Sequence, residues 1–337
     1  MGKPLFTVFT PTFNRADTLP RVYESLKAQT FRGFEWIIVD DGSIDNTYEI
    51  IKMWMQVVDF PIRYLRQENS GKHVAFNLGV REAKGELFLP LDSDDACVPN
   101  ALERFRFHWY SISSEKRDEF TGVCAHCMDQ NGRLVGNLFP FNPTDSDILE
   151  IRFRYKVKGE KWGFNRTNVL RRFPFPENEN MKFIPEGIVW NGIAKFYRIR
   201  FVNEILRTYY VQESNGSAQL SQSLDDIKEI ISKKYTIGCA LYYESFLRDH
   251  ISWLWYEPIQ FFLSAISYMR FSLHCGNTLN GVLKKVHSLE GRILILFGSP
   301  IATMLYFCDL RNIFVVHLVR RNTKNLFRKI FYLFRAK

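Results

Sequence analysis

Short apolar runs and segments of helical period take turns over the first hundred residues of the chain. The short runs are rich in Val, Ile, Phe and Leu and too brief for helices, which predicts strands at 5–10, 36–39, 62–65 and 88–91. Apolar residues three and four positions apart predict helices between them, at 17–29, at 47–58 and after Gly71, with Asp17 as the first N-cap. This alternation predicts an α/β fold with a mainly parallel central sheet.

The regular alternation stops after the first hundred residues. The pattern there predicts a helix at 99–113, a strand at 122–128 and an irregular stretch with four prolines at 136–180. Order returns at 181–197, where Phe183-Ile-Pro-Glu186 leads into a helix, and a strand at 208–212 and a polar loop at 214–223 follow. Beyond the loop the pattern is helical. We therefore expect two parts, an α/β domain at 1–212 and a helical C-terminal region at 213–337.

Acidic residues gather where two of the predicted strands end. Asp40 and Asp41 follow one strand, and three acids follow another: Asp92, Asp94 and Asp95. In open α/β sheets the carboxyl ends of parallel strands share one edge, where ligands bind, so we expect the two clusters to converge in one cleft. Carboxylates held this close repel one another and favour a hard cation, Mg²⁺ or Mn²⁺, which would neutralise a diphosphate.

Other interpretations of these acids stay open. A lone Asp-x-Asp is often a solvated turn that caps the next helix, here the one near Pro99. An Mg²⁺-dependent phosphoryl-transfer enzyme or phosphatase on a doubly wound sheet would also use clustered acids. Its nucleophilic Asp would be expected at the end of the first strand, where this chain has Thr10-Pro11-Thr12, and the chain has no Gly-x-x-x-x-Gly-Lys phosphate loop. A non-catalytic membrane adaptor would leave both acidic clusters unexplained.

Composition sets limits on the class of protein. The 337 residues are 46% hydrophobic, enough for one large core or two modest ones. The formal charge of +9 is concentrated at 251–337, which holds 12 Lys and Arg against three acids.

Six scattered cysteines do not form a disulfide framework, and Cys124-Ala-His-Cys127 lacks the second pair that a zinc site needs, so we interpret it as part of a strand. With no signal-peptide pattern at the start, these features predict a reduced, cytoplasmic setting.

Basic and apolar residues are interleaved at the C-terminal end. Residues 293–308 are apolar, but this stretch of 16 residues is interrupted by Gly298-Ser-Pro300, and a membrane span needs about 20 apolar residues, so none is expected. From 313 to 334 the pattern predicts a basic amphipathic helix peripheral to an anionic membrane, at the inner face of the cell membrane. The alternative is a helix packed on the body with a solvated basic face. No reading motif for nucleic acid is present, so nucleic acid is not an expected partner.

Three motifs carry a resemblance to a known family: Thr7-Val-Phe-Thr-Pro-Thr-Phe-Asn-Arg15, Trp36-Ile-Ile-Val-Asp-Asp-Gly-Ser43 and Leu89-Pro-Leu-Asp-Ser-Asp-Asp95. In order and spacing they resemble the family 2 glycosyltransferases of the GT-A fold, over roughly the first 210 residues. The resemblance implies a nucleotide-sugar-binding GT-A fold and a metal-dependent, inverting glycosyltransferase. It further implies a UDP-sugar as the first choice of donor, hexosyl or N-acetylhexosaminyl transfer, and a lipid-linked or saccharide acceptor in bacterial surface polysaccharide or exopolysaccharide synthesis.

The resemblance also implies roles for individual residues. Asp41 would accept a hydrogen bond from the nucleobase, and Asp40 would support the turn. Lys72 or His73 would reach phosphate or sugar, unless Lys72 is simply a solvated residue at a helix start. Asp94 is the first choice for direct contact with Mn²⁺ or Mg²⁺. The full set comprises the metal ligands Asp94 and Asp95 and the nucleotide-sugar-binding residues Pro11, Thr12, Asn14, Arg15, Asp40, Asp41, Lys72, Asp92 and Ser93.

An inverting transfer needs a general base on the acceptor hydroxyl, and the resemblance assigns this role to Glu186. The family places the acid at the head of a helix, which corresponds here to Phe183-Ile-Pro-Glu186. Many members carry a further acid beside it, so Gly187 is a departure from the pattern. The alternative is an acid that complements the helix dipole. In the irregular stretch, Trp162 could stack on a sugar ring, although core packing is the commoner role of Trp.

Overall fold

The computed structural model describes residues 2–210 and 232–311. The predicted polar loop at 214–223 and the predicted basic amphipathic helix at 313–334 lie outside the described residues. So does the predicted domain boundary between residues 212 and 213, which stays a prediction.

The chain divides into two compact units, and each is described by itself. The first is formed by Met1–Glu177 with Val189–Glu213, and the second by Asn178–Ile188 with Ser214–Lys337. The first unit carries the central sheet, and the described part of the second consists of helices together with the short segment that leads into α7 (Gly187–Ile193).

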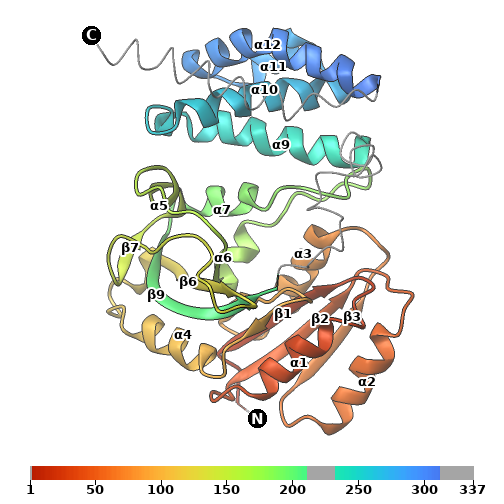
Figure 1. Ribbon diagram of the computed structural model, residues 1–337, viewed down its shortest axis with the longest axis vertical. Helices are drawn as coiled ribbons and strands as arrows, with labels where there is room; N and C mark the ends of the chain where they lie inside the picture. The colour runs from red at the N-terminus through yellow and green to blue at the C-terminus, as the bar shows by residue number, and fades with distance from the viewer. Residues whose placement is uncertain (1, 211–231, 312–337) are drawn as a thin grey trace. The chain divides into compact units, whose positions relative to one another are not determined.

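The N-terminal half of the sheet is parallel, with its strands in the order β3-β2-β1-β4 (Figure 1). The bounds are β1 Phe6–Thr12, β2 Phe34–Asp40, β3 Ile62–Arg66 and β4 Leu87–Pro90. In this register Val8 of β1 lies between Trp36 of β2 and Leu89 of β4. Every residue of β1 and β2 is buried, as expected for a parallel sheet covered on both faces.

Three helices connect these strands: α1 Leu19–Lys27, α2 Thr47–Val57 and α3 Lys72–Glu82. The prediction of Asp17 as the N-cap of α1 is wrong, because Thr18 holds that position. The Arg15 carbonyl accepts hydrogen bonds from the backbone N–H groups of both Thr18 and Leu19, so residues 15–18 form a turn and the helix starts after it.

The sheet continues beyond β4 in the order β8-β6-β9-β5, with β7 beside β9. The bounds are β5 Ala96–Cys97, β6 Phe120–Asp129, β7 Thr144–Ser146, β8 Lys161–Arg166 and β9 Arg198–Tyr209. Strand β8 is antiparallel to both β4 and β6, whereas β6 and β9 are parallel. The predicted α/β fold with a mainly parallel central sheet is confirmed.

The second half of the first unit differs most from expectation. The irregular stretch 136–180 contains β7, β8 and two short helices, and one further helix follows β5: α4 Ala101–Tyr110, α5 Ile148–Phe153 and α6 Thr167–Arg172. Of the predicted strand at 208–212, the first two residues are the end of the much longer β9, and residues 211 and 212 lie outside the described residues. The helix predicted to follow Glu186, with apolar residues as far as Phe196, is α7, and it ends earlier, at Ile193.

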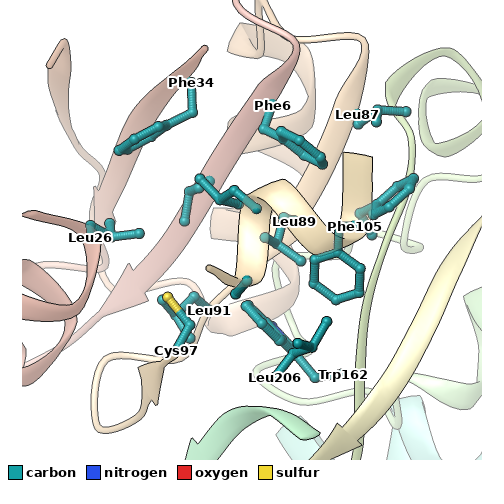
Figure 2. Packing of buried hydrophobic residues seen from close by; sticks show 14 of the residues in the cluster. Phe6, Leu26, Phe34, Leu87, Leu89, Leu91, Cys97, Phe105, Trp162 and Leu206 are labelled. Carbon is teal, nitrogen blue, oxygen red and sulfur yellow. The ribbon is translucent and has the colours of Figure 1, made fainter. Parts of the chain in front are cut away.

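Apolar side chains from β1, β2, β4, α1 and α4 form the main core of this unit (Figure 2). Trp162 lies in this core, in edge-to-face contact with Phe105, and its indole N–H donates to the Pro90 carbonyl at 2.5 Å. Its role is therefore core packing, and the alternative of sugar stacking is wrong. Cys124 and Cys127 are free thiols on β6, which confirms the interpretation of that pair as strand residues.

The described part of the second unit is mainly helical, which confirms the predicted helical C-terminal region. Its helices are α9 Lys233–Asp249, α10 Pro258–His274, α11 Leu279–Lys285 and α12 Leu289–Leu310, with a 3-10 turn at Ile251–Trp253. Helix α10 packs against both α9 and α12 (Figure 1).

Helix α12 runs through Gly298-Ser299-Pro300 without a break, contrary to the expected interruption. Pro300 has no N–H to donate to the Leu296 carbonyl four residues earlier, and the Ser299 hydroxyl donates to that carbonyl instead, at 2.9 Å. The helix has 22 residues. Among the described residues it is the one helix that is long and apolar enough to cross a membrane, judged by length and composition alone.

Candidate active site

The loops after β1 and β2 are tied together. Asn14, at a positive φ of 52°, donates its backbone N–H to Ser43 Oγ at 2.9 Å and accepts from the Ile44 N–H at 2.9 Å. Asp45 accepts from the Ala16 N–H at 3.0 Å. Asn tolerates left-handed backbone better than most residues, which suits it to this position. The two loops are therefore held in one fixed arrangement.

Asp40 closes the turn at the end of β2. The side chain is buried, with one carboxylate oxygen accepting from the Ser43 N–H at 2.7 Å and the other from the Tyr64 hydroxyl at 2.6 Å. Both oxygens thus have local partners. This geometry agrees with a supporting role in the turn.

Asp41 binds the segment that leads into α3. One of its oxygens accepts from Gln67 Nε2 and from the Ser70 N–H, both at 2.7 Å, and the other accepts from the Gly71 N–H at 2.9 Å. A carboxylate offers about four acceptor positions, so one remains for a ligand.

Lys72 links the two acidic clusters. It follows Gly71, which Asp41 binds, and its Nζ lies 2.9 Å from Asp92 Oδ1. Burial raises the pKa of Asp92, but the attraction of Lys72 and of two more distant arginines outweighs burial and holds the pKa below its usual value. His73 is buried, so Lys72 is the one of this pair that is accessible to a ligand.

Helix α1 holds the backbone of the second acidic cluster. The Thr18 hydroxyl donates to the Ser93 carbonyl at 2.9 Å, and Arg21 donates to the Asp94 carbonyl at 3.4 Å. The Arg21 guanidinium also lies 4.5 Å from the centre of the Tyr210 ring. The loop is thus anchored through main-chain atoms, which leaves its side chains to bind other groups.

Asp94 and its surroundings are the accessible part of this cluster. The Asp94 side chain is 28% exposed, and its contact with Arg15 Nη1 is long, at 3.9 Å. Ser93, directly before Asp94, is buried, and so are Pro11 and Thr12 at the end of β1. The Thr12 hydroxyl oxygen has no hydrogen-bond partner among the described residues.

Asp95 points inward instead. It is 1% exposed, its Oδ2 lies 3.4 Å from Arg207 Nε, and its Oδ1 accepts from the Tyr210 N–H at 3.1 Å. Arg207 also donates to Glu160 at 3.1 Å. Burial raises the pKa of Asp95 to about 7, against the opposing pull of Arg207 and helped by the neighbouring Asp92.

The fit of a divalent cation differs between the two predicted ligands. No cluster of three or more His, Cys, Asp or Glu side chains suited to a metal occurs within residues 2–210 and 232–311. Mg²⁺ in nucleotide enzymes, however, commonly takes one or two carboxylates and completes its shell with substrate phosphates and water. Asp94 fits that pattern as an accessible oxygen ligand, whereas Asp95 would first have to separate from Arg207.

Comparison with known proteins identifies the family. Residues 7–127 match the model of "Glycosyl transferase family 2". RP339 of Rickettsia prowazekii, an uncharacterized glycosyltransferase, is 36% identical over 244 residues, which are 69% of this chain and 73% of the relative. The chain belongs to glycosyltransferase family 2. Glycosyltransferase GlyG of Streptococcus pneumoniae is 28% identical over 70% of this chain and 81% of its own. An uncharacterized glycosyltransferase of Rickettsia bellii is 27% identical over 65% of this chain but only 31% of its own length.

Solved structures share the glycosyltransferase fold. Residues 1–349 of S. aureus TarS, in complex with UDP-GlcNAc, match with a TM-score of 0.54 and 19% identity over 94% of this chain and 91% of that one. The mannosyltransferase PcManGT of Pyrobaculum calidifontis, in complex with GDP-Man and Mn²⁺, matches with a TM-score of 0.51 and 16% identity over 97% and 88%. At this level of identity the likeness is evidence of fold alone. The predicted GT-A type fold and the predicted family are confirmed.

Glu186, the predicted base of this family 2 glycosyltransferase, lies in the second unit, directly before α7. It is exposed. The structure gives a reason for Gly187 beside it: a Cβ atom there would come within 2.8 Å of the Tyr242 ring on α9. A second acid at that position would therefore clash, whatever the role of Glu186.

Several residues of the site have no signal in the sequence. Asp41 is bound by Gln67, the acidic loop is held by Thr18 and Arg21, and Asp95 is paired with Arg207. Gln67, Thr18, Arg21 and Arg207 belong to no recognisable motif, and each lies far along the chain from the acid or loop that it contacts. Arg207 is one of three arginines in β9, and nothing in the sequence separates it from Arg198 and Arg200, although a buried arginine normally requires an acidic partner.

Proposed function

We propose that this protein transfers a sugar from a nucleotide-diphosphate-sugar donor to an acceptor hydroxyl with inversion of the anomeric centre. The observation that carries the proposal is the link through Gly71 and Lys72, which brings the Asp41 and Asp92 carboxylates to the same edge of the sheet. That edge, beyond the carboxyl ends of parallel strands, is where open α/β sheets bind their ligands.

The proposed donor site has a nucleoside part and a diphosphate part. The fixed loops after β1 and β2 would hold the base and ribose, through Pro11, Thr12, Asn14, Arg15, Asp40 and Asp41. The remaining acceptor position on Asp41 suits a donor N–H of a nucleobase. A UDP-sugar is our first choice, which is supported by the UDP-GlcNAc bound to TarS, and the GDP-Man bound to PcManGT makes a GDP-sugar the next.

Lys72 and Asp94 would act on the diphosphate. Lys72, now paired with Asp92, is a mobile cation that can turn to a phosphate oxygen. Asp94 would hold Mn²⁺ or Mg²⁺ beside Ser93, and such an ion would supply positive charge for the departing diphosphate. Asp95 could contact the ion only by giving up its pair with Arg207.

Glu186 would remove the proton from the acceptor hydroxyl. Its exposed position before α7 is compatible with access to an acceptor. Inversion by direct displacement needs one such base and no covalent intermediate. The sugar transferred would be a hexosyl or N-acetylhexosaminyl group.

We further propose that the acceptor is a lipid-linked or other saccharide in bacterial surface polysaccharide or exopolysaccharide synthesis, met at the inner face of the cytoplasmic membrane. This is supported by the C-terminal sequence, where eight Lys and Arg and no acids occur from residue 310 to 337. Residues 1–212 would then bind the donor and catalyse transfer, and 213–337 would associate with the membrane.

Incubation with UDP-, GDP- and TDP-sugars tests the proposal. We expect nucleoside diphosphate release with one donor, dependent on Mn²⁺ or Mg²⁺ and abolished by EDTA, and NMR of the product should show inverted anomeric configuration. Retention of configuration would exclude the direct displacement. The alternative, a phosphoryl-transfer enzyme, predicts release of inorganic phosphate, and it is disfavoured because β1 ends in Thr12 rather than a nucleophilic Asp.

A further inference from the structure

Helix α12 exposes a continuous apolar face. Seven large apolar side chains of this helix are exposed, at Leu289, Ile293, Leu296, Phe297, Met304, Phe307 and Leu310. No charged residue occurs from 293 to 308. Only 28% of the most apolar 18-residue stretch of α12 is buried, so α12 is not the core helix of this unit.

The opposite face of α12 is firmly attached to α10. Gly298 lies against Ile266, where a Cβ would come within 3.0 Å of a side-chain carbon. Asp309 accepts two hydrogen bonds from Arg270, at 2.5 and 2.6 Å, and lies 2.9 Å from His274 Nε2. All three side chains of this ionic cluster are buried.

We propose that the exposed face of α12 lies in the headgroup region of an anionic membrane, with the helix parallel to the surface. The charge of the neighbouring sequence favours an anionic membrane as the partner of this face: residues 311–337, which follow α12 directly, hold eight Lys and Arg and no acid, and anionic lipid attracts such segments. Apolar burial and charge then act in adjoining segments of the sequence. The docking rests on the membrane-linked acceptor proposed above, and adds the surface by which the enzyme would reach it.

The ionic cluster favours lying on the membrane over crossing it. To span a bilayer, α12 would have to leave α10 and separate Asp309 from Arg270, leaving charges unpaired in an apolar environment. Breaking a buried pair of this kind is strongly unfavourable. An in-plane helix keeps the cluster intact and buries only its outward face.

Vesicle binding by the full chain tests the proposal. The main variant is Phe297→Glu, whose site is 74% exposed, and the matched control is Val57→Glu on α2, whose site is 75% exposed. With vesicles of phosphatidylglycerol and phosphatidylcholine, we expect Phe297→Glu to weaken binding roughly tenfold or more, because one buried Phe contributes on that order. Phe307→Glu should do the same, and Val57→Glu should bind as the wild type does. Circular dichroism melts confirm folding of each variant.

Several outcomes would overturn the docking. The proposal fails if the wild type does not bind anionic vesicles, or if Phe297→Glu binds them as tightly as the wild type does. It also fails if Val57→Glu loses as much vesicle affinity as Phe297→Glu. Resistance to alkaline carbonate extraction would indicate a span. A concentration-dependent dimer that Phe297→Glu dissolves would assign the face to a second copy. Nucleoside diphosphate release in solution is measured alongside: its presence without vesicle binding rejects the docking alone, and its absence for every sugar with binding intact rejects the proposed function.

Discussion

Arg207 Nε lies 3.4 Å from Asp95 Oδ2, and both side chains are buried beside the acidic loop. We predict that Arg207 positions this loop. Arg207→Met leaves Asp95 without its cation, which should weaken binding of UDP with Mn²⁺ by roughly tenfold or more and destabilise the fold by about 3–5 kcal/mol. Arg207→Lys keeps the charge but loses the planar guanidinium, so it should restore binding only in part. Calorimetric titration and thermal melts measure the two effects.

Arg200 provides the matched control, because it is another arginine of β9 and pairs with Asp145 through two hydrogen bonds at 2.7 and 2.8 Å. Arg200→Met should also lower the melting temperature but leave nucleotide affinity unchanged. If both variants lose affinity in proportion to stability, Arg207 has only a structural role.

Asp94→Asn should uncouple nucleotide binding from the divalent ion. The amide keeps the shape of the side chain but is a poor ligand for a hard cation, so Mn²⁺ should no longer strengthen UDP binding. Turnover should fall by roughly 10²-fold or more, since charge stabilisation of the leaving group is lost. Asp17→Asn, at an exposed position of the same region, is the control and should behave as the wild type. Unchanged metal dependence in Asp94→Asn would remove Asp94 from the metal site.

Glu186→Gln should keep donor affinity and lose turnover by roughly 10²- to 10⁴-fold, because the amide cannot accept the proton of the acceptor. Steady-state rates with a saturating acceptor and titration with UDP separate the two quantities. Glu179→Gln, at an exposed position of the same unit, is the control. A loss of donor affinity in Glu186→Gln would mean that the base is another residue.

The parallel half of the sheet was predictable because its information is local. Apolar runs, helical periods and the acids at strand ends each occupy a few consecutive residues, and the order of elements then decides which strand ends meet. Asp40, Asp41 and Asp92 accordingly lie where the sequence placed them, at the ends of β2 and β4.

The antiparallel half and the fine structure of the site depend on distant partners. Strand β8 pairs with β4 and β6 from within the proline-bearing stretch that had no period of its own. Likewise the family resemblance assigned Asp95 to the metal together with Asp94, yet the inward turn of the Asp95 side chain depends on Arg207 of β9. No local pattern distinguishes those two acids.

The sequence pattern was also misleading at α12, where Gly298 and Pro300 suggested an interruption of the apolar stretch. The Ser299 hydroxyl satisfies the carbonyl that Pro300 leaves without a donor, and Gly298 permits close packing on Ile266. Tertiary contacts therefore outweigh helix propensity here, as they commonly do.

Glu204 offers a prediction of stability against pH that is independent of the proposed reaction. Hydrogen bonds from Arg104, with a further contact from His108, lower the pKa of Glu204 to about 2. Since the folded pKa lies below the unfolded value of about 4.3, this stabilisation is fully present above that value and is lost as the pH falls towards 2. Glu204→Gln should thus cost about 1–2 kcal/mol at pH 7 and progressively less below pH 4.3. Urea unfolding across this range, with the exposed Glu119→Gln as control, measures the difference; a constant gap between wild type and Glu204→Gln would mean that the carboxylate charge contributes nothing.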